Sequence, residues 1–137
     1  MNSLPFTIRG VYTQLVDLEG LARVDGTELV LEFRTSALRG IIKSQPKELR
    51  VSVSDLEEVT FKRVFLSGAL NLRARRMGTF ASIPGSVGSE LRLRCKRAYW
   101  GAAQELASHL GLRLVEQQLR SMIDQTGRPT ELPPPRK

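Results

Sequence analysis

Residues 91–110 read LRLRCKRAYWGAAQELASHL, and a change of pattern inside this stretch decides the fold. Up to Lys96, apolar and basic residues alternate, which is typical of a strand with one buried face. The residues expected to face inward are Leu91, Leu93 and Cys95, and those expected to face outward are Arg92, Arg94 and Lys96. From about Ala98 the apolar spacing becomes that of an amphipathic helix. We therefore expect a sheet whose last strand runs directly into a C-terminal helix.

The helix pattern shows one broad apolar stripe and a defined end. Its apolar residues recur at steps of three, four and five positions: Ala103, Leu106, Ala107, Leu110, Leu114, Leu119 and Met122. Gly111 interrupts the pattern at a cost of up to about 1 kcal/mol relative to alanine, so the last turns can bend or separate there. Gly127 and Pro129 mark the stop, and residues 127–137 are predicted to form a flexible, proline-rich tail.

The residues before this stretch follow the two-residue period of strands. Glu28–Arg34 alternates cleanly, and Asp25-Gly26 predicts a hairpin that joins it to Gly20–Val24. Further strands are predicted at Leu49–Ser54, around Val59 and Phe61, at Ala69–Arg75 and at Phe80–Ile83, with an edge strand within residues 5–13. About seven antiparallel strands and one helix indicate a mainly β fold, a bent barrel or sandwich capped by the helix.

Length and composition bound the organisation of the chain. Its 137 residues suit one domain, which we expect to span residues 1–126 with a core from about 20 to 123. The single cysteine cannot form an internal disulfide, and the start lacks the pattern of a signal peptide. A cytoplasmic protein without a transmembrane segment is therefore expected.

The net charge of +7 is concentrated in one third of the chain. Residues 62–97 hold nine basic side chains against one acidic residue, Glu90. The candidate anion- or partner-binding face consists of Arg73, Arg75, Arg92, Arg94 and Lys96. These side chains could combine into one cationic surface that attracts lipid headgroups or nucleic-acid phosphates. The alternative is a solvated sheet face that is arginine-rich only because of codon bias.

The order of elements resembles the pleckstrin-homology (PH) fold, particularly the PH-like domains of bacteria. The likeness is carried by Gly20–Thr35, Leu49–Phe61, Ala69–Arg76 and Gly85–Leu110, roughly residues 20–120. It implies a binding or assembly module rather than an enzyme. The family's inositol-phosphate site uses basic residues near the loop between the first two strands. We expect that loop at Asp25-Gly26-Thr27-Glu28, which is acidic, so the lipid site is not carried over.

Apolar residues suggest a second kind of contact. The segment Ser36–Pro46 contains Leu38, Ile41 and Ile42, which could insert into a membrane, cover a neighbour or form a short helix packed on the sheet. Trp100 and the adjacent Tyr99 either close the end of the barrel or make an exposed contact with a partner or a membrane interface.

The residue types present favour binding over catalysis. No catalytic constellation, metal cluster or cofactor motif can be assembled from the sequence, since Cys95 is expected to be buried and His109 stands alone. The leading hypothesis is a non-catalytic interaction module that binds a protein partner or self-associates. The alternatives are peripheral binding to anionic lipid through the arginine-rich face and, more weakly, nucleic-acid binding by the same face.

Overall fold

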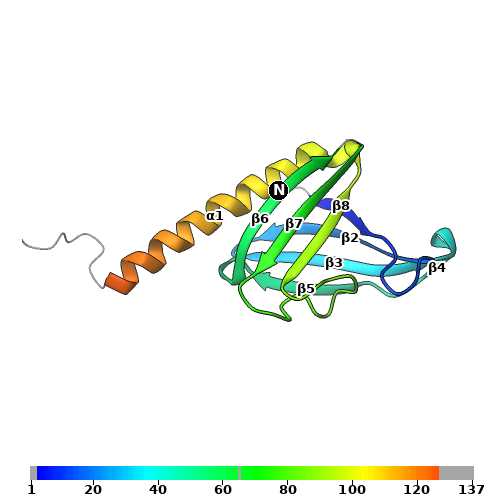
Figure 1. Cartoon of the computed structure of the whole chain (residues 1–137), viewed down its shortest axis with the longest axis horizontal. Helices are drawn as coiled ribbons and strands as arrows, with labels where there is room; N and C mark the ends of the chain where they lie inside the picture. The colour runs from blue at the N-terminus through cyan, green and yellow to red at the C-terminus, as the bar shows by residue number, and fades with distance from the viewer. Residues whose placement is uncertain (1–2, 65, 127–137) are drawn as a thin grey trace, which may run out of the picture.

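The computed structural model describes residues 3–64 and 66–126, which form one antiparallel sheet and one long helix (Figure 1). The strands are β1 (Leu4–Ile8), β2 (Val16–Asp25), β3 (Glu28–Ala37), β4 (Ile42–Lys43), β5 (Lys47–Ser52), β6 (Leu56–Val64), β7 (Ser67–Ala74) and β8 (Glu90–Cys95). Three short 3-10 turns, η1 (Leu38–Gly40), η2 (Val53–Asp55) and η3 (Arg97–Tyr99), precede the helix α1 (Trp100–Thr126). The predicted mainly β fold with a C-terminal helix is confirmed, while the tail at 127–137 lies outside the described residues.

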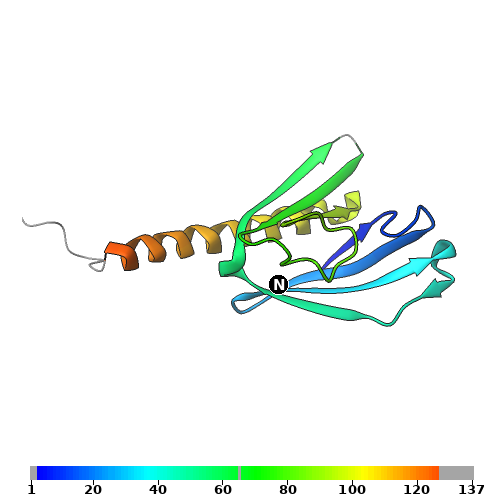
Figure 2. The ribbon, with the colours of Figure 1, turned by 60° about the horizontal axis from the view of Figure 1, so that its bottom comes forward.

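The sheet is strongly bent and is not closed. Its strand order is β4-β3-β2-β1-β8-β7-β6, with β5 also paired to β3, and every pairing is antiparallel. The described part contains eight strands, of which the two-residue β4 was not predicted. Figures 1 and 2 show β2, β3 and β5 forming one layer and β6, β7 and β8 crossing over it. The two halves meet where Thr7 of β1 pairs with Arg94 of β8.

Local chemistry explains the central hairpin. Asp25 pairs with Glu28 at the end of β2 and β3, leaving a two-residue turn. Gly26 takes the first turn position with φ of +63°, a conformation that glycine adopts without the steric cost of a side chain. The Asp25-Gly26 signal therefore marked this hairpin correctly, although β2 begins earlier than the sequence predicted, at Val16.

The core lies between the two layers and beneath α1. Apolar residues that alternate along the strands fill it, because one face of each strand is turned away from water. The fully buried side chains include Leu4, Leu18, Leu29, Leu31, Leu56, Leu70, Leu72, Phe80, Ile83, Leu91, Leu93 and Leu106. On β8 the predicted alternation is confirmed, with Leu91, Leu93 and Cys95 buried.

Two strand predictions were wrong. The segment 5–13 was expected to supply an edge strand, but β1 lies inside the sheet between β2 and β8. Residues Phe80–Ile83 form turns rather than a strand, within the connection between β7 and β8. Their apolar pattern had a different cause, since Phe80 and Ile83 insert into the core from this connection.

The helix differs from its predicted form in two ways. It runs without a break through Gly111, and its apolar residues form two stripes instead of one. Ala103, Leu106, Ala107, Leu110 and Leu114 are buried against the sheet. Leu119 and Met122, which were assigned to the same stripe, are 54% and 62% exposed. Leu119 follows Leu114 by five residues. At about 100° per residue, a step of five turns the side chain away from the core-facing side of the helix.

Candidate functional site

The outer face of the sheet carries a continuous cross-strand row of polar residues. Pairing places Arg34 of β3 beside Glu19 of β2, Glu19 beside Thr7, and Thr7 beside Arg94 of β8. This row crosses the seam where the two halves of the sheet meet. Residues from distant parts of the sequence therefore share one surface.

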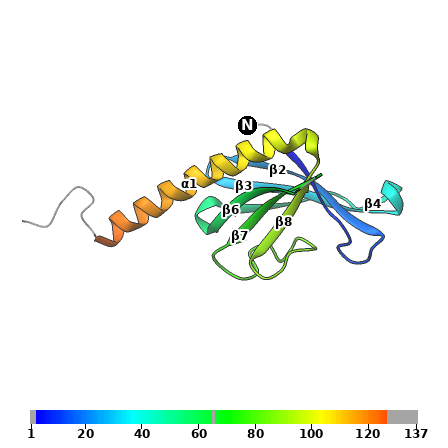
Figure 3. The ribbon, with the colours of Figure 1, turned by 45° about the horizontal axis from the view of Figure 1, so that its top comes forward.

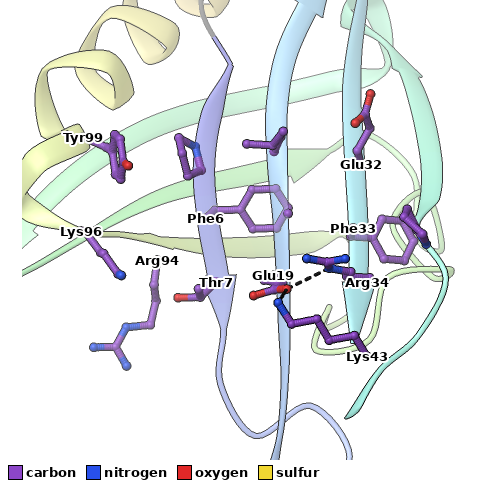
Figure 4. A pocket seen from close by; sticks show the side chains of 14 residues that line it. Phe6, Thr7, Glu19, Glu32, Phe33, Arg34, Lys43, Arg94, Lys96 and Tyr99 are labelled. Atoms are coloured by element: carbon purple, nitrogen blue, oxygen red, sulfur yellow. Dashed lines mark hydrogen bonds and ion pairs between the residues drawn. The ribbon is translucent and has the colours of Figure 1, made fainter. Parts of the chain in front are cut away.

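A pocket of about 440 Å³ lies over this row (Figure 4). Its lining comes from β1, β2, β3, β4, β8 and η3, together with Pro46 before β5 and Lys96 after β8. The lining residues are Pro5, Phe6, Thr7, Glu19, Gly20, Leu21, Glu32, Phe33, Arg34, Lys43, Pro46, Arg94, Lys96 and Tyr99. The volume falls in the range of small-molecule sites.

One side of the pocket is occupied by a cluster around Glu19. Arg34 Nε donates to Glu19 Oε1 at 2.8 Å, and Lys43 Nζ lies 3.2 Å from the same oxygen. Partial burial opposes ionisation of the carboxyl group, but the hydrogen bonds from Lys43 and Arg34 outweigh it and lower the pKa of Glu19. Glu19 is therefore an anion at neutral pH whose charge is already matched by two cations.

The opposite side of the pocket carries cations that are not matched. Figure 4 shows Arg94 and Lys96 extending from the β8 side, with Thr7 between them and the Glu19 cluster. Among residues 3–64 and 66–126, neither side chain forms an ion pair. Tyr99, on the turn that leads into α1, borders the same side.

The five residues of the predicted cationic face lie in different surroundings. Arg73 is neutralised by Glu57 and Glu58 of β6, with Arg73 Nη2 at 3.7 Å from Glu57 Oε1. Arg92 lines a second hollow of about 330 Å³ together with Glu58 and Glu90. Arg75 follows the end of β7 and is exposed. Only Arg94 and Lys96 of the five predicted residues line the first pocket.

The predicted apolar contact residues also lie in two separate places, with Leu38, Ile41 and Ile42 in one and Trp100 in the other. A short helix does form in this segment, the 3-10 turn η1, but Leu38, Ile41 and Ile42 are exposed at one end of the sheet and are not packed on it. Because Val16 pairs with Ala37, the loop between β1 and β2 leaves the sheet beside them, and it adds the exposed Tyr12 and Leu15. Figure 1 shows this end of the sheet, marked by β4, lying away from the C-terminal end of α1.

Trp100 is not part of that apolar group. Its indole Nε1 donates to the Cys95 carbonyl at 3.2 Å, and its ring is half-buried against Gly68 of β7. The guanidinium carbons of Arg63 and Arg97 lie 5.7 and 5.9 Å from the ring centre. Trp100 therefore anchors the start of α1 to the end of the sheet, as one of its two predicted roles required.

The loop between the first two strands lies elsewhere than the sequence predicted. The turn at Asp25–Glu28 joins β2 to β3, whereas the loop between the first two strands spans residues 9–15. That loop contains the single basic residue Arg9 and no acidic residue. The loop at residues 9–15 therefore exposes apolar side chains, Tyr12 and Leu15, and is not an acidic turn.

A second surface lies on the part of α1 that extends past the sheet, as Figures 1 and 3 show. Leu114 is the last buried residue of the helix in the described chain. Leu112, Val115, Leu119 and Met122 are 52% to 66% exposed and follow one another at steps of three, four and three. At about 100° per residue they form a stripe roughly 150° around the helix from the buried side chains. The 3-4-3 spacing was readable in the sequence but was merged with the core stripe.

Comparisons with known proteins give no family or function to which these surfaces can be related. The chain matches no protein-family model, no curated protein and no solved structure at a significant level. Within the described residues no three His, Cys, Asp or Glu side chains are grouped as metal ligands would be. Nor does that part of the chain include a helix with the length and apolarity that a membrane crossing requires.

Proposed function

We propose that this chain is a non-catalytic interaction module with a PH-like fold that self-associates through α1. The strand order and the C-terminal helix over one end of the bent sheet support the likeness to that fold. The exposed stripe of Leu112, Val115, Leu119 and Met122 is the observation that carries the proposed self-association. Four large apolar side chains in one charge-free stripe are a typical helix-pairing surface.

The partner proposed for this stripe is a second copy of the same helix, running antiparallel. The stripe is nearly symmetric, so Leu112 of one copy meets Met122 of the other and Val115 meets Leu119. Along one border of the stripe stand Arg113, Glu116, Arg120 and Asp124. In an antiparallel pair this border meets the same border of the partner, with Arg113 opposite Asp124 and Glu116 opposite Arg120. In a parallel pair it would face the partner's other border, and these opposite charges would not meet. Charge complementarity therefore favours the antiparallel pair.

The energetics suit a weak dimer. Burying the exposed part of each apolar side chain contributes about 1 kcal/mol, or about 8 kcal/mol for the pair. Association costs an estimated 4–15 kcal/mol. Because a 12-residue helix without tertiary contacts is only marginally stable in water, pairing also supports the projecting half of α1. We expect dimers that form with increasing concentration.

Sedimentation equilibrium over a concentration series tests the proposal. Leu119→Glu, in the middle of the stripe, should keep the protein monomeric, whereas Ser121→Glu adds the same charge on the other side of the helix and should leave dimers intact. Arg120→Glu should weaken the dimer, and the double variant Glu116→Arg/Arg120→Glu should restore it if the helices are antiparallel. A wild-type protein that stays monomeric at the highest concentration would refute the self-association.

A second candidate function is contact with anionic membranes through the end of the sheet that carries Tyr12, Leu15, Leu38, Ile41 and Ile42. These exposed apolar side chains favour insertion at a lipid surface, and Arg9 and Arg39 are close to them in the sequence. Cosedimentation with anionic and neutral vesicles tests it. Selective binding to anionic vesicles that Ile41→Glu abolishes would support this function, and equal or absent binding would exclude it.

A further inference from the structure

We propose that the pocket between β1, β2, β3 and β8 binds a small organic phosphate monoester. In this assignment the phosphate group lies at Arg94 and Lys96, and the organic part lies over Pro5 and Leu21. The site is independent of the α1 stripe and of the apolar end of the sheet.

Some of the basic side chains in the pocket are paired with carboxylates and others are not. Arg34 and Lys43 are held by Glu19, and Glu32 is held by Arg23, whose Nη1 lies 2.5 Å from Glu32 Oε1. Arg94 and Lys96 therefore supply the excess charge, at one end of the pocket only. A ligand with its negative charge at one end matches this arrangement, because Glu19 and Glu32 disfavour a second anionic group at the other end.

The geometry of β8 suits a phosphate group. Arg94 lies on β8 and Lys96 directly follows the strand in extended backbone, so the two side chains leave the same face at about 7 Å spacing. Two long cationic side chains at that spacing can converge on one oxyanion, and the Thr7 hydroxyl on the paired strand can donate to it. Two unmatched positive charges also favour a dianion over a carboxylate, and a phosphate monoester is a dianion above its second pKa of about 6.

The remaining surface of the pocket suits a compact apolar group. Pro5 and Leu21 are paired neighbours on β1 and β2, and Leu21 is exposed at 38% although it lies in the middle of the sheet. A volume of about 440 Å³ accommodates a ring or short chain attached to the phosphate. The exposed side chains that a membrane would contact lie instead on the loops at the end of the sheet. A small soluble ligand is therefore favoured over a lipid.

Isothermal titration calorimetry with phenyl phosphate tests the assignment. Phenyl phosphate should bind at pH 7.5, inorganic phosphate should bind at least tenfold more weakly, and phenol should not bind measurably. The affinity for phenyl phosphate should fall as the pH drops from 7.5 to 5, since the ligand becomes a monoanion. Absence of phenyl phosphate binding, or equal affinity for inorganic phosphate, would overturn the proposal.

Matched variants of Arg92, Arg94 and Lys96 locate the site. Arg94→Gln and Lys96→Gln should each weaken phenyl phosphate binding by about tenfold or more, because each removes a hydrogen bond to a charged group. Arg92→Gln removes the same charge two residues away, in the other hollow, and should leave the affinity unchanged. An equal loss in all three variants would show non-specific attraction and overturn the site. Arg94-dependent binding to phosphatidic acid vesicles without binding of phenyl phosphate would likewise overturn the assignment to a small soluble ligand.

Discussion

Replacing Gly68 by alanine tests how α1 is anchored to the sheet. A Cβ atom at Gly68 would lie 2.3 Å from Trp100 Nε1 and 3.0 Å from the ring of Phe61. Ordinary contacts between heavy atoms begin near 3.5 Å, so the indole would have to retreat by roughly 1 Å. That movement breaks its hydrogen bond to the Cys95 carbonyl, now 3.2 Å long.

The expected cost follows from the contacts that Trp100 makes. The hydrogen bond contributes about 1 kcal/mol, and each stacked arginine contributes about 0.5–1 kcal/mol at an exposed site. With the packing lost around the displaced ring, Gly68→Ala should lower the free energy of unfolding by about 2–3 kcal/mol. At a urea m-value of about 1–3 kcal/mol/M, the unfolding midpoint should fall by roughly 0.7–3 M.

The measurement is direct because Trp100 is the only tryptophan of the chain. Its emission should shift to longer wavelength in native Gly68→Ala, and urea unfolding followed by fluorescence and circular dichroism should give the lower midpoint. Gly101→Ala is the matched control, since its Cβ meets open space and its helix propensity improves. A Gly68→Ala protein with wild-type emission and midpoint would refute the anchoring argument.

Three further predictions concern other parts of the molecule. Gly111→Ala, whose Cβ meets open space in a continuous helix, should stabilise the protein by up to about 1 kcal/mol in thermal unfolding; a loss of stability would contradict the open environment of this position. Burial raises the pKa of the Cys95 thiol to about 11, so its neutral form stabilises the fold below the unfolded pKa of about 8.5, and this contribution is lost as the pH rises toward 11. Urea midpoints should therefore fall over that range more steeply in the wild type than in Cys95→Ala, and identical profiles would count against it. Glu19→Gln should lower stability by less than about 1 kcal/mol at pH 7 but tighten phenyl phosphate binding roughly threefold or more, because it frees Arg34 and Lys43; unchanged or weaker binding in calorimetry would argue against the charge arrangement of the pocket. The stabilisation from Glu19 itself is present above its unfolded pKa of about 4.3 and is lost as the pH falls through the lowered folded value.

The strands that alternate most regularly were predictable because burial on one face dictates their residue types. Leu91, Leu93 and Cys95 point inward as expected, and Asp25-Gly26 marks a hairpin. The prediction failed where apolar residues were buried without being in a strand. Phe80 and Ile83 enter the core from a connection, and nothing in local periodicity distinguishes that arrangement from a short strand.

The candidate sites were less predictable than the fold. The arginine-rich face was inferred from alternation along single strands, which cannot reveal what pairs with each strand. The charge of Arg73 is matched by Glu57 and Glu58 of the neighbouring strand. Arg94 lines a pocket because β1 pairs with β8. Glu19 was not singled out, since its role depends on Arg34 and Lys43 meeting it across strands.

By itself the sequence determined which residues avoid water, and therefore the antiparallel strands, the central hairpin and the helix that follows β8. It also determined the excess of positive charge and the spacing of Leu112, Val115, Leu119 and Met122. Only the tertiary structure decided that most of this stripe lies on the part of α1 that projects past the sheet. It also decided that, among the described residues, Arg94 and Lys96 have no ion-pair partner and lie across the pocket from Glu19. The physical reason is that the spacing of apolar residues along the chain shows which side chains are buried. Which charges are paired depends instead on which strands lie side by side.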